Sequence, residues 1–389
     1  MFRDYTFIIA FHEAIPIGPS FDLKKFLFIT PPKKLFFISH PLLYNKLAYK
    51  NSSWYEYHEN GRLIFKRKAF HWILPEPVHY IKDVLYTFFW CSRISGKFDV
   101  FVGLNPLNAL VGILLKRFGK VKKVVYYSID YFPQRFENSL MNNIYHSTDK
   151  LAVKFSDETW NVSPNMAISR NEYHHDPNLF KKQFTVPIVA WVRGTKRVKF
   201  NEIDKKKLVF IGLLDKSSGL ELIIKALPKI INKIKNVKLE VIGGGPNLDY
   251  LKQLAKKFKV DSNIIFHDWI INREKVEEII SHSAVGLVLF NTREFGTEIK
   301  NADPMKIKDY MSLGLTIIST DAILTADEII KAKSGIIIHF DVNELADAVI
   351  KLLGDEKLLK AYRKNALDYI KKFDAEKVFG DNLTRLLSV

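Results

Sequence analysis

The stretch that decides the fold is "KKLVFIGLLDKSSGLELIIKALPKIINKIKNVKLEVIGGGPNLDYLKQLAKKFK", residues 206–259. Residues 206–214 and 237–245 are short apolar runs that end near glycine, which is typical of buried strands. Residues 220–234 and 247–259 repeat their apolar positions every three or four residues, as amphipathic helices do. Strands that alternate with such helices predict βαβ units around a parallel sheet covered on both faces.

The same alternation extends in both directions. Downstream, we expect strands at 262–270, 284–290 and 315–320 and helices at 273–283 and 304–314. The first half shows the alternation less clearly. Strands are expected there at 5–11, 34–39, 98–104, 122–130 and 157–163, and a hairpin or edge strand at 60–68. Helices are expected at 77–94, 107–119 and 138–155. The charged residues 191–207 lack periodicity and suit a connection. The sequence therefore predicts an α/β protein of two Rossmann-like, doubly wound domains facing a central cleft.

Composition narrows the class of protein. A chain of 389 residues is longer than one hydrophobic core usually supports, so two domains are expected. One cysteine, Cys91, excludes a disulfide framework or a multi-cysteine zinc site. The start lacks the layout of a signal peptide, and no apolar run reaches the ~18 residues of a membrane span. We therefore expect a cytoplasmic protein.

The formal net charge of +17 is compatible with nucleic acid, an anionic membrane or phosphate-rich ligands. No recognition-module pattern accompanies the charge, so we expect no nucleic-acid partner. Residues 31–37 and 114–123 interleave basic and apolar side chains. Two interpretations stay open for them: solvated basic faces of amphipathic helices, or peripheral docking on anionic lipid at the inner face of the cell membrane.

Two loops at strand ends could bind an anion. In the first, Gly243, Gly244 and Gly245 precede a helix, which either brings backbone N–H groups to a phosphate or merely makes a tight turn. The full G-x-G-x-x-G pattern is absent. The second loop begins at Gly212, adds the charge of Lys216, and offers Ser218 and Gly219 at a helix start.

The segment "NADPMKIKDYMSLGLTIIST" (301–320) carries a third candidate. Pro304 is placed to open a helix, and Lys306 and Asp309, three residues apart, share a face. They could form an ordinary surface ion pair. Alternatively, Asp309 accepts hydrogen bonds from ribose hydroxyls while Lys306 meets a phosphate, because a carboxylate suits a vicinal diol.

The order of "VFIGLLDKSSGLELIIKAL", "VKLEVIGGGPNLDYLKQLA", "NIIFHDWI", "AVGLVLF", "PMKIKDYMSLGLTIIST" and "SGIIIHFDVNELADAVIKLL" resembles the retaining GT-B glycosyltransferases of the large nucleotide-sugar-dependent family, glycosyl transferases group 1. The likeness covers residues 207–375 and is weaker before them. It implies an N-terminal acceptor domain (1–198), a C-terminal nucleotide-sugar domain (199–372) and a last helix (373–389) that returns to the first domain.

Carried over by position, the resemblance gives Asp309 the ribose-binding role of the second acid in the family's pair. The first acid falls at Asn301, so Glu294 and Glu298 are candidates to replace it. The family's diphosphate-binding cations fall at Leu213 and Ser218, which leaves Lys216 and Lys306 to supply that charge. His267, Asp268 and Trp269 would approach the nucleobase.

In the first half, Asp130 follows a strand and is the further catalytic candidate, beside Glu294 and Glu298. His12 and Glu13, after the first strand, are acceptor-side candidates. "HEAIP" is no H-E-x-x-H zinc site because Pro16 replaces the second histidine. Together with the lack of a D-x-D triplet, this predicts a site without metal or other cofactor.

The resemblance implies transfer of a hexose-type sugar from a nucleotide-diphosphate sugar, UDP-linked by preference, to a glycan or lipid-linked acceptor, with retention at the anomeric carbon. Two alternatives remain. One is a non-catalytic partner subunit of the same fold that binds nucleotide or lipid. The other is a sugar-nucleotide 2-epimerase, which would need cleft carboxylates that the sequence does not offer convincingly.

Overall fold

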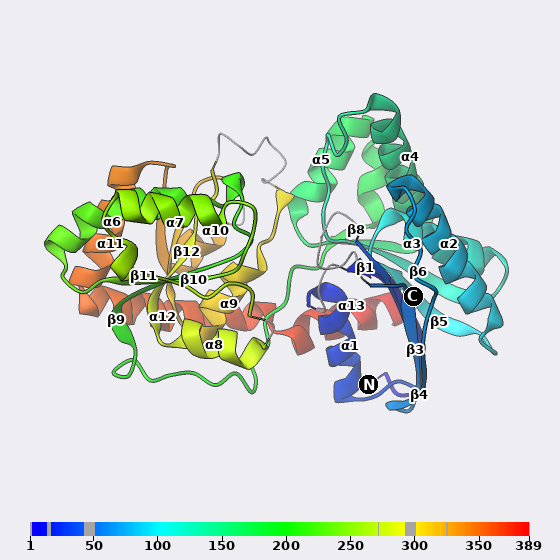
Figure 1. Ribbon diagram of the computed structural model, residues 1–389. Helices are drawn as coiled ribbons and strands as arrows, with labels where there is room; N and C mark the ends of the chain where they lie inside the picture. Colours follow the sequence, from blue (N-terminus) through cyan, green and yellow to red (C-terminus); the bar gives the residue numbers. More distant parts are fainter. Residues whose placement is uncertain are drawn as a thin grey trace. The chain divides into compact units, whose positions relative to one another are not determined.

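The computed structural model describes residues 2–13, 17–42, 51–270, 272–291, 301–323 and 326–388 (Figure 1). The chain forms two compact units. Unit 1 comprises Met1–Pro187 together with Val378–Val389, and unit 2 comprises Ile188–Lys377. Each unit has its own sheet.

The sheet of unit 2 has six parallel strands in the order β11-β10-β9-β12-β13-β14. The strands are β9 (Asp204–Ile211), β10 (Lys238–Ile242), β11 (Ile264–Phe266), β12 (Ser283–Val288), β13 (Thr316–Thr320) and β14 (Gly335–Ile338). The helices are α6 (Leu220–Lys233), α7 (Leu248–Lys257), α8 (Arg273–Ser281), α9 (Met305–Leu313), α10 (Asp327–Ala332), α11 (Val342–Gly354) and α12 (Glu356–Tyr369).

Alternate residues along the strands of unit 2 pack into two different cores. On β9, Leu208 and Phe210 join a cluster with α6, α7 and α11, whereas Val209 joins a cluster with α8, α9 and α10. Figure 1 shows the first set of helices and α8 and α9 on opposite faces of the sheet. The strands are apolar on both faces because both faces are covered. The doubly wound α/β arrangement predicted from residues 206–259 is confirmed.

Unit 1 contains an eight-stranded sheet in the order β4-β3-β2-β1-β5-β6-β7-β8. Its strands are β1 (Thr6–Glu13), β2 (Lys34–Pro41), β3 (Trp54–Glu59), β4 (Arg62–Lys68), β5 (Phe98–Gly103), β6 (Val121–Ser128), β7 (Glu158–Asn161) and β8 (Gln183–Thr185). Most pairs are parallel, but β3 runs antiparallel to β2 and β4. The β3–β4 hairpin turns at Asn60 and Gly61, which both have positive φ, and β4 is the edge strand expected at 60–68.

The helices of unit 1 are α1 (Pro19–Ile29), α2 (Glu76–Arg93), α3 (Pro106–Arg117), α4 (Ser139–Phe155) and α5 (Pro164–His174). The last helix, α13 (Ala375–Ser388), adds its residues from Val378 onward to this unit. Its Phe379 ring lies 5.6 Å from that of Phe26 on α1, and Arg385 forms an ion pair with Glu158 of β7 at 2.7 Å.

Some element predictions were wrong or incomplete. The sequence did not predict α1, β3 or α5. Pro304 is the N-cap of α9 rather than its first helical residue, because the helix begins at Met305. His12 and Glu13 do not follow the first strand. They are the last two residues of β1, where they stay in register with His40 and Pro41 of β2.

Candidate functional site

The loop between β9 and α6, residues 212–219, lies at the carboxyl end of the sheet in unit 2. The backbone N–H of Ser217 donates to Asp215 Oδ1 at 3.0 Å, and Ser218 Oγ donates to the Asp215 carbonyl at 2.8 Å. Gly219 has φ 65°, and a Cβ there would come within 3.0 Å of Leu289. Glycine is therefore required where the loop turns into α6. The first N–H groups of a helix lack intrahelical partners, so this end of α6 attracts anions.

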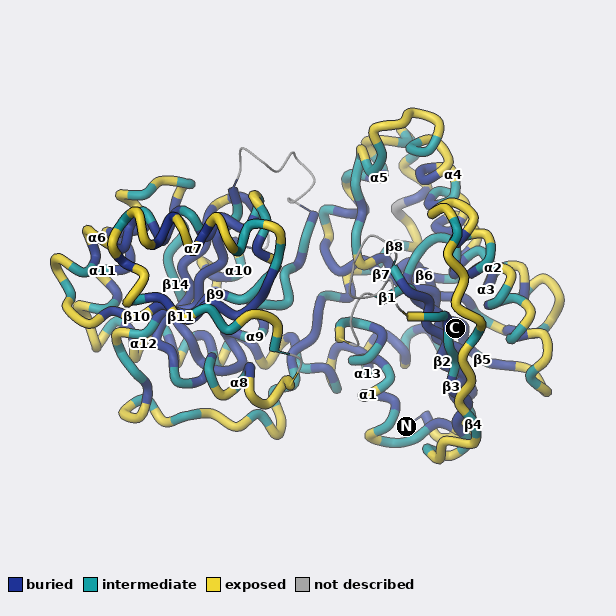
Figure 2. The backbone as a smooth tube through the Cα atoms, in the orientation of Figure 1, coloured by how far each residue is buried: buried dark blue, intermediate teal, exposed yellow. Residues whose placement is uncertain are grey.

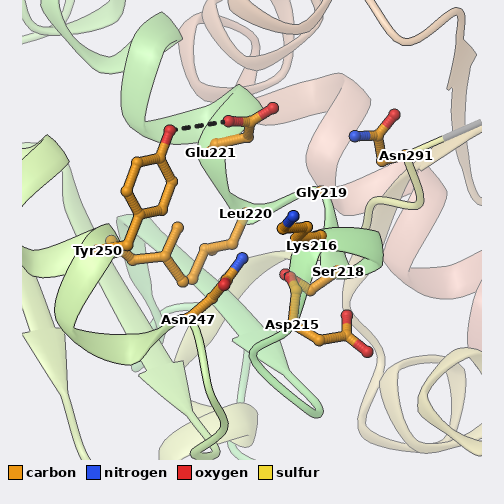
Figure 3. Close-up of a pocket in the computed structure, with 10 residues that line it drawn as sticks. Asp215, Lys216, Ser218, Gly219, Leu220, Glu221, Asn247, Tyr250 and Asn291 are labelled. Atoms are coloured by element: carbon orange, nitrogen blue, oxygen red, sulfur yellow. Dashed lines mark hydrogen bonds between the residues drawn. The ribbon is translucent and has the colours of Figure 1, made fainter. Parts of the chain in front are cut away.

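A cavity of about 420 Å³ opens at this loop (Figure 3). Its size is in the range of small-molecule sites. It is lined by Asp215, Lys216, Ser218, Gly219, Leu220, Glu221, Asn247, Tyr250, Leu251 and Asn291. Three of the predicted donor-site residues, Lys216, Ser218 and Gly219, thus lie together.

The lining of the cavity is chemically mixed. Lys216 and the N-terminus of α6 favour an anion, whereas Asp215 and Glu221 bring carboxylates. Glu221 Oε2 accepts a hydrogen bond from the Tyr250 hydroxyl at 3.3 Å, on one side of the cavity (Figure 3). Such a site suits a ligand that combines phosphate with hydroxyl groups, because carboxylates accept from hydroxyls.

The glycine segment after β10 packs directly against the β9–α6 loop. The N–H of Gly212 donates to the Ile242 carbonyl at 3.1 Å, and that of Leu214 donates to the Gly244 carbonyl at 3.0 Å. A Cβ on Gly243 would lie 1.9 Å from the Gly212 carbonyl oxygen. These contacts favour the tight-turn interpretation of the three glycines: they allow two loop backbones to touch, and Gly243 and Gly244 are buried.

The turn after β11 joins the same group of loops. Asp268 has φ 58°, and its carbonyl accepts a hydrogen bond from the N–H of Gly243 at 2.9 Å. The Asp268 and Trp269 side chains lie beside Gly244, where a Cβ would meet them within 2.7 Å. Trp269 is 43% exposed, so one aromatic ring beside the glycine segment is open to a ligand. His267 instead bonds Glu240 on β10.

Lys306 extends from α9 toward the start of the β9–α6 loop. Its amine lies 4.8 Å from the centroid of the Phe210 ring and 4.9 Å from that of Phe290. A Cβ on Gly212 would be only 3.2 Å from the Lys306 Nζ. Burial disfavours the ammonium and lowers the pKa of Lys306 to about 8, although Asp215 acts in the opposite direction. The structure therefore places beside Gly212 an amine whose charge changes near pH 8.

Asp309, one turn further along α9, faces a different partner. Its two carboxylate oxygens accept hydrogen bonds from the Arg273 guanidinium of α8 at 2.5 and 3.2 Å. The Asp309 side chain is 15% exposed and that of Arg273 is 45% exposed. Burial acts to lower the pKa of Arg273, but the Asp309 and Glu277 carboxylates beside it outweigh that effect and raise it. Lys306 thus contacts the Phe210 and Phe290 rings, whereas Asp309 pairs with Arg273. Glu294 and Glu298 lie outside the described residues.

In unit 1, His12 belongs to a buried polar cluster at the end of β1. Its Nε2 lies 3.2 Å from Asp83 Oδ2 of α2, and its Nδ1 lies 2.6 Å from Asn105 Nδ2. Asp83 also bonds Ser53 and Lys82, at 3.0 and 2.9 Å, and lies 3.2 Å from His40. The neighbouring histidines and their hydrogen bonds hold the pKa of Asp83 well below its usual range, despite its burial.

Glu13 and Asp130 occupy other positions at strand ends of this unit. Glu13 accepts hydrogen bonds from Ser39 and Trp54, at 2.5 and 3.1 Å, and burial raises the pKa of its carboxyl group. Asp130, after β6, bonds Arg135 at 3.1 Å and is 46% exposed on its side chain. Within the ranges that the structure describes, no cluster of His, Cys, Asp and Glu has the arrangement of a metal site.

Several site residues were not predicted from the sequence. Asp215 could have been found, since an acid two residues before a serine at a helix start is a capping signal. Asn247, Tyr250, Arg273 and Asp83 gave no comparable signal, because their roles depend on which helices pack together.

Several known proteins resemble this chain in sequence. Residues 192–368 match the family model of glycosyl transferases group 1. An uncharacterized glycosyltransferase of Methanocaldococcus jannaschii is 23% identical over 330 residues, covering 82% of each chain. The GDP-mannose-dependent alpha-(1-6)-phosphatidylinositol monomannoside mannosyltransferase of Mycolicibacterium smegmatis is 23% identical over 169 residues, covering 42% of this chain and 43% of that one.

Among solved structures, that of Anabaena HepE in complex with UDP-glucose aligns with a TM-score of 0.70 at 13% identity, covering 99% of this chain and all of the other. Within the described residues, no helix is long and apolar enough to cross a bilayer. Fold, loop order and sequence likeness agree. Residues 192–368 therefore form a domain of the glycosyl transferases group 1 family, and the chain is a glycosyltransferase with the GT-B fold.

Proposed function

We propose that this enzyme transfers a hexose-type sugar from a nucleotide-diphosphate sugar, UDP-linked by preference, to a glycan or lipid-linked acceptor, with retention and without a metal. The observation that carries the proposal is the cavity at the N-terminus of α6, where Lys216, Ser218 and Gly219 meet. The UDP-glucose bound to HepE supports a UDP-sugar, and the mycobacterial relative's name supports a lipid acceptor for that protein.

The main chemical task is to stabilise the negative charge that grows on the departing diphosphate. Transfer passes through an oxocarbenium-like state, as in glycoside hydrolysis. In our proposal the α6 N-terminus and Lys216 receive one phosphate, and Lys306, beside Gly212, receives the other. With retention, the departing phosphate can take the proton of the acceptor, so no dedicated protein base is required.

We propose that the remaining loops of unit 2 bind the nucleoside. Asp309 would accept hydrogen bonds from the ribose hydroxyls, and Arg273 would hold that carboxylate in position. Trp269 and the backbone near Asp268 would meet the base. His12 and Glu13, at the end of β1 in unit 1, are proposed to serve the acceptor, and Asp130, after β6, is proposed as a catalytic residue. Peripheral binding to the inner face of the cell membrane would give access to a lipid-linked acceptor.

Two measurements test the proposal. First, a thermal-shift screen of UDP-, GDP- and ADP-sugars should raise the melting temperature for one base, because a ligand that binds only the folded state stabilises it. Second, nucleotide release from donor plus acceptor should continue in the presence of EDTA and fall at least about tenfold in Asp309→Ala, the loss expected for one buried hydrogen-bonded contact.

Asp261→Ala, an acidic substitution in the turn before β11, is the matched control and should turn over normally. Unchanged turnover in Asp309→Ala would contradict the ribose assignment. A protein that binds nucleotide but releases none with any acceptor would be a non-catalytic partner subunit. Conversion of the sugar nucleotide to its 2-epimer without acceptor would identify the epimerase alternative.

A further inference from the structure

Helix α2 presents apolar side chains to solvent. Val78, Ile81, Leu85 and Phe89 are 43%, 61%, 61% and 47% exposed. Their spacing of three or four residues places them along one stripe of the helix. Isolated exposed apolar residues are normal, but a continuous stripe indicates an interaction surface.

The opposite side of α2 packs against unit 1. His79, Asp83 and Thr87 face the interior, where Asp83 contacts His12 and Thr87 bonds His40 at 2.7 Å. On the same helix, Cys91 joins the apolar core, and Val84 and Phe88 pack against it. The exposed stripe is therefore a second apolar surface of α2, in addition to the one that meets the core.

Helix α4 also has apolar residues on both sides. Its buried side carries Ala152 and Val153 of the core together with Asp149, which pairs with Arg170 at 2.7 Å. Its exposed apolar residues are Leu140, Ile144, Leu151 and Phe155, which are 66%, 49%, 44% and 52% exposed.

The three helices form one layer on the sheet of unit 1, because α3 packs against both α2 and α4 (Figure 1). The end of α3 adds Leu114 and Phe118, 42% and 69% exposed, and the Phe118 ring lies 6.2 Å from Phe88 of α2. Figure 2 colours the outer side of this layer largely as exposed or intermediate. We call these ten side chains the apolar face: Val78, Ile81, Leu85, Phe89, Leu114, Phe118, Leu140, Ile144, Leu151 and Phe155.

Cations border the apolar face. Of the six basic residues on the three helices, Lys82, Lys116 and Lys150 form ion pairs with Asp83, Asp157 and Asp176, at 2.9, 2.6 and 3.9 Å. The other three are Arg93, Arg117 and Lys154. Arg93 lies 4.0 Å over the ring of Phe89, and Lys154 lies 5.5 Å from that of Phe155. Cations thus border the apolar stripes directly.

We propose that the apolar face binds the surface of an anionic lipid bilayer, with α2 and α4 lying in the interface. Apolar stripes bordered by Lys and Arg are what an interfacial helix needs, since the side chains enter the acyl boundary while the cations meet lipid phosphates. A second copy of the chain fits less well, because two faces of the same positive charge would repel each other. The inference rests on the peripheral membrane binding of the proposed function and deepens it by naming the surface that makes the contact.

Sedimentation with vesicles tests the apolar part. At low salt, the wild type should bind vesicles of phosphatidylcholine mixed with phosphatidylglycerol and should bind pure phosphatidylcholine weakly. The double variant Ile81→Ser, Leu85→Ser should lower the partition coefficient at least about tenfold, because it removes two large side chains from the lipid. The control Ile265→Ser, Ile330→Ser changes two apolar residues of unit 2 that are 45% and 58% exposed, and should bind normally.

A charge reversal tests the electrostatic part. Arg117→Glu, on α3, should weaken binding to the anionic vesicles by about twentyfold, since each basic residue near such a surface contributes about fivefold. Lys351→Glu on α11 makes the same change in net charge away from the apolar face and should have little effect.

All variants should keep the wild-type melting temperature and the wild-type affinity for UDP, whose proposed cavity lies in unit 2. Loss of vesicle binding with intact nucleotide binding therefore concerns this inference alone. Equal binding of the apolar double variant and its control would overturn it. So would light scattering that shows a wild-type dimer, broken by Ile81→Ser, Leu85→Ser, with no binding to vesicles.

Discussion

The pH dependence of nucleotide binding gives a direct test of Lys306. In the free protein its pKa is lowered to about 8, because its amine is packed between the rings of Phe210 and Phe290. A diphosphate would require the ammonium form. Above pH 8 the binding-competent fraction falls, and the affinity falls by a factor of 1 + 10^(pH − 8), which is about 1.1 at pH 7 and about 11 at pH 9.

We therefore expect the Kd for UDP to rise about tenfold between pH 7 and pH 9 in the wild type, measured by isothermal titration calorimetry. At pH 9, buffers of different ionisation enthalpy should reveal uptake of close to one proton. Lys306→Arg should show no such slope, because guanidinium stays charged. Lys306→Met should bind more weakly at pH 7 and also show no slope. An equal pH slope in Lys306→Met would refute the role of this amine.

The same substitution predicts a gain in stability without ligand. Because the folded-state pKa of Lys306 is below its ordinary value of 10.5, the unfolded chain binds more protons between about pH 8 and pH 10.5. The contribution of this lysine to stability therefore rises with pH across that window, and at pH 7 its buried charge costs up to about 3 kcal/mol. Lys306→Met should melt several degrees higher than the wild type at pH 7, and a lower melting temperature would contradict the burial argument.

Two further substitutions, one in each unit, test contacts that stabilise the folded protein. Gly243→Ala should destabilise the protein by more than about 2 kcal/mol in a denaturant titration, because its Cβ would overlap the Gly212 carbonyl, whereas Gly354→Ala, with open space around it, should be neutral. Asp83→Asn should cost about 3–5 kcal/mol at pH 7, since it removes the buried carboxylate that pairs with Lys82 and accepts from Ser53. Because the pKa of Asp83 is lowered on folding, this difference should shrink as the pH falls below about 3.8, and a constant difference would contradict the ion-pair explanation.

The sheet of unit 2 could be predicted because its strands are covered on both faces and so read as nearly continuous apolar runs, as in residues 208–214. Helix α2 could also be predicted from its periodicity, but its orientation could not. A stripe such as Val78, Ile81 and Leu85 looks the same in sequence whether it faces a core or solvent.

The site was partly predictable for a similar reason. Local signals placed Lys216, Ser218 and Gly219 at a helix start, and the cavity lies there. The pairing of Asp309 with Arg273 depends on how α8 packs against α9, which no local pattern contains. The glycines after β10 were visible, but the reason for them is a neighbouring loop whose approach only the structure reveals.

The return of α13 to unit 1 affects the order in which the protein can be made. Phe26 and Glu158 are synthesised early, yet their partners Phe379 and Arg385 emerge only after the whole of unit 2. During translation, unit 1 therefore cannot complete its fold until α13 has been made, whereas all residues of unit 2 are made before the end of α13. A chain truncated after residue 377 should hold a folded C-terminal half and an N-terminal half that lacks its last helix.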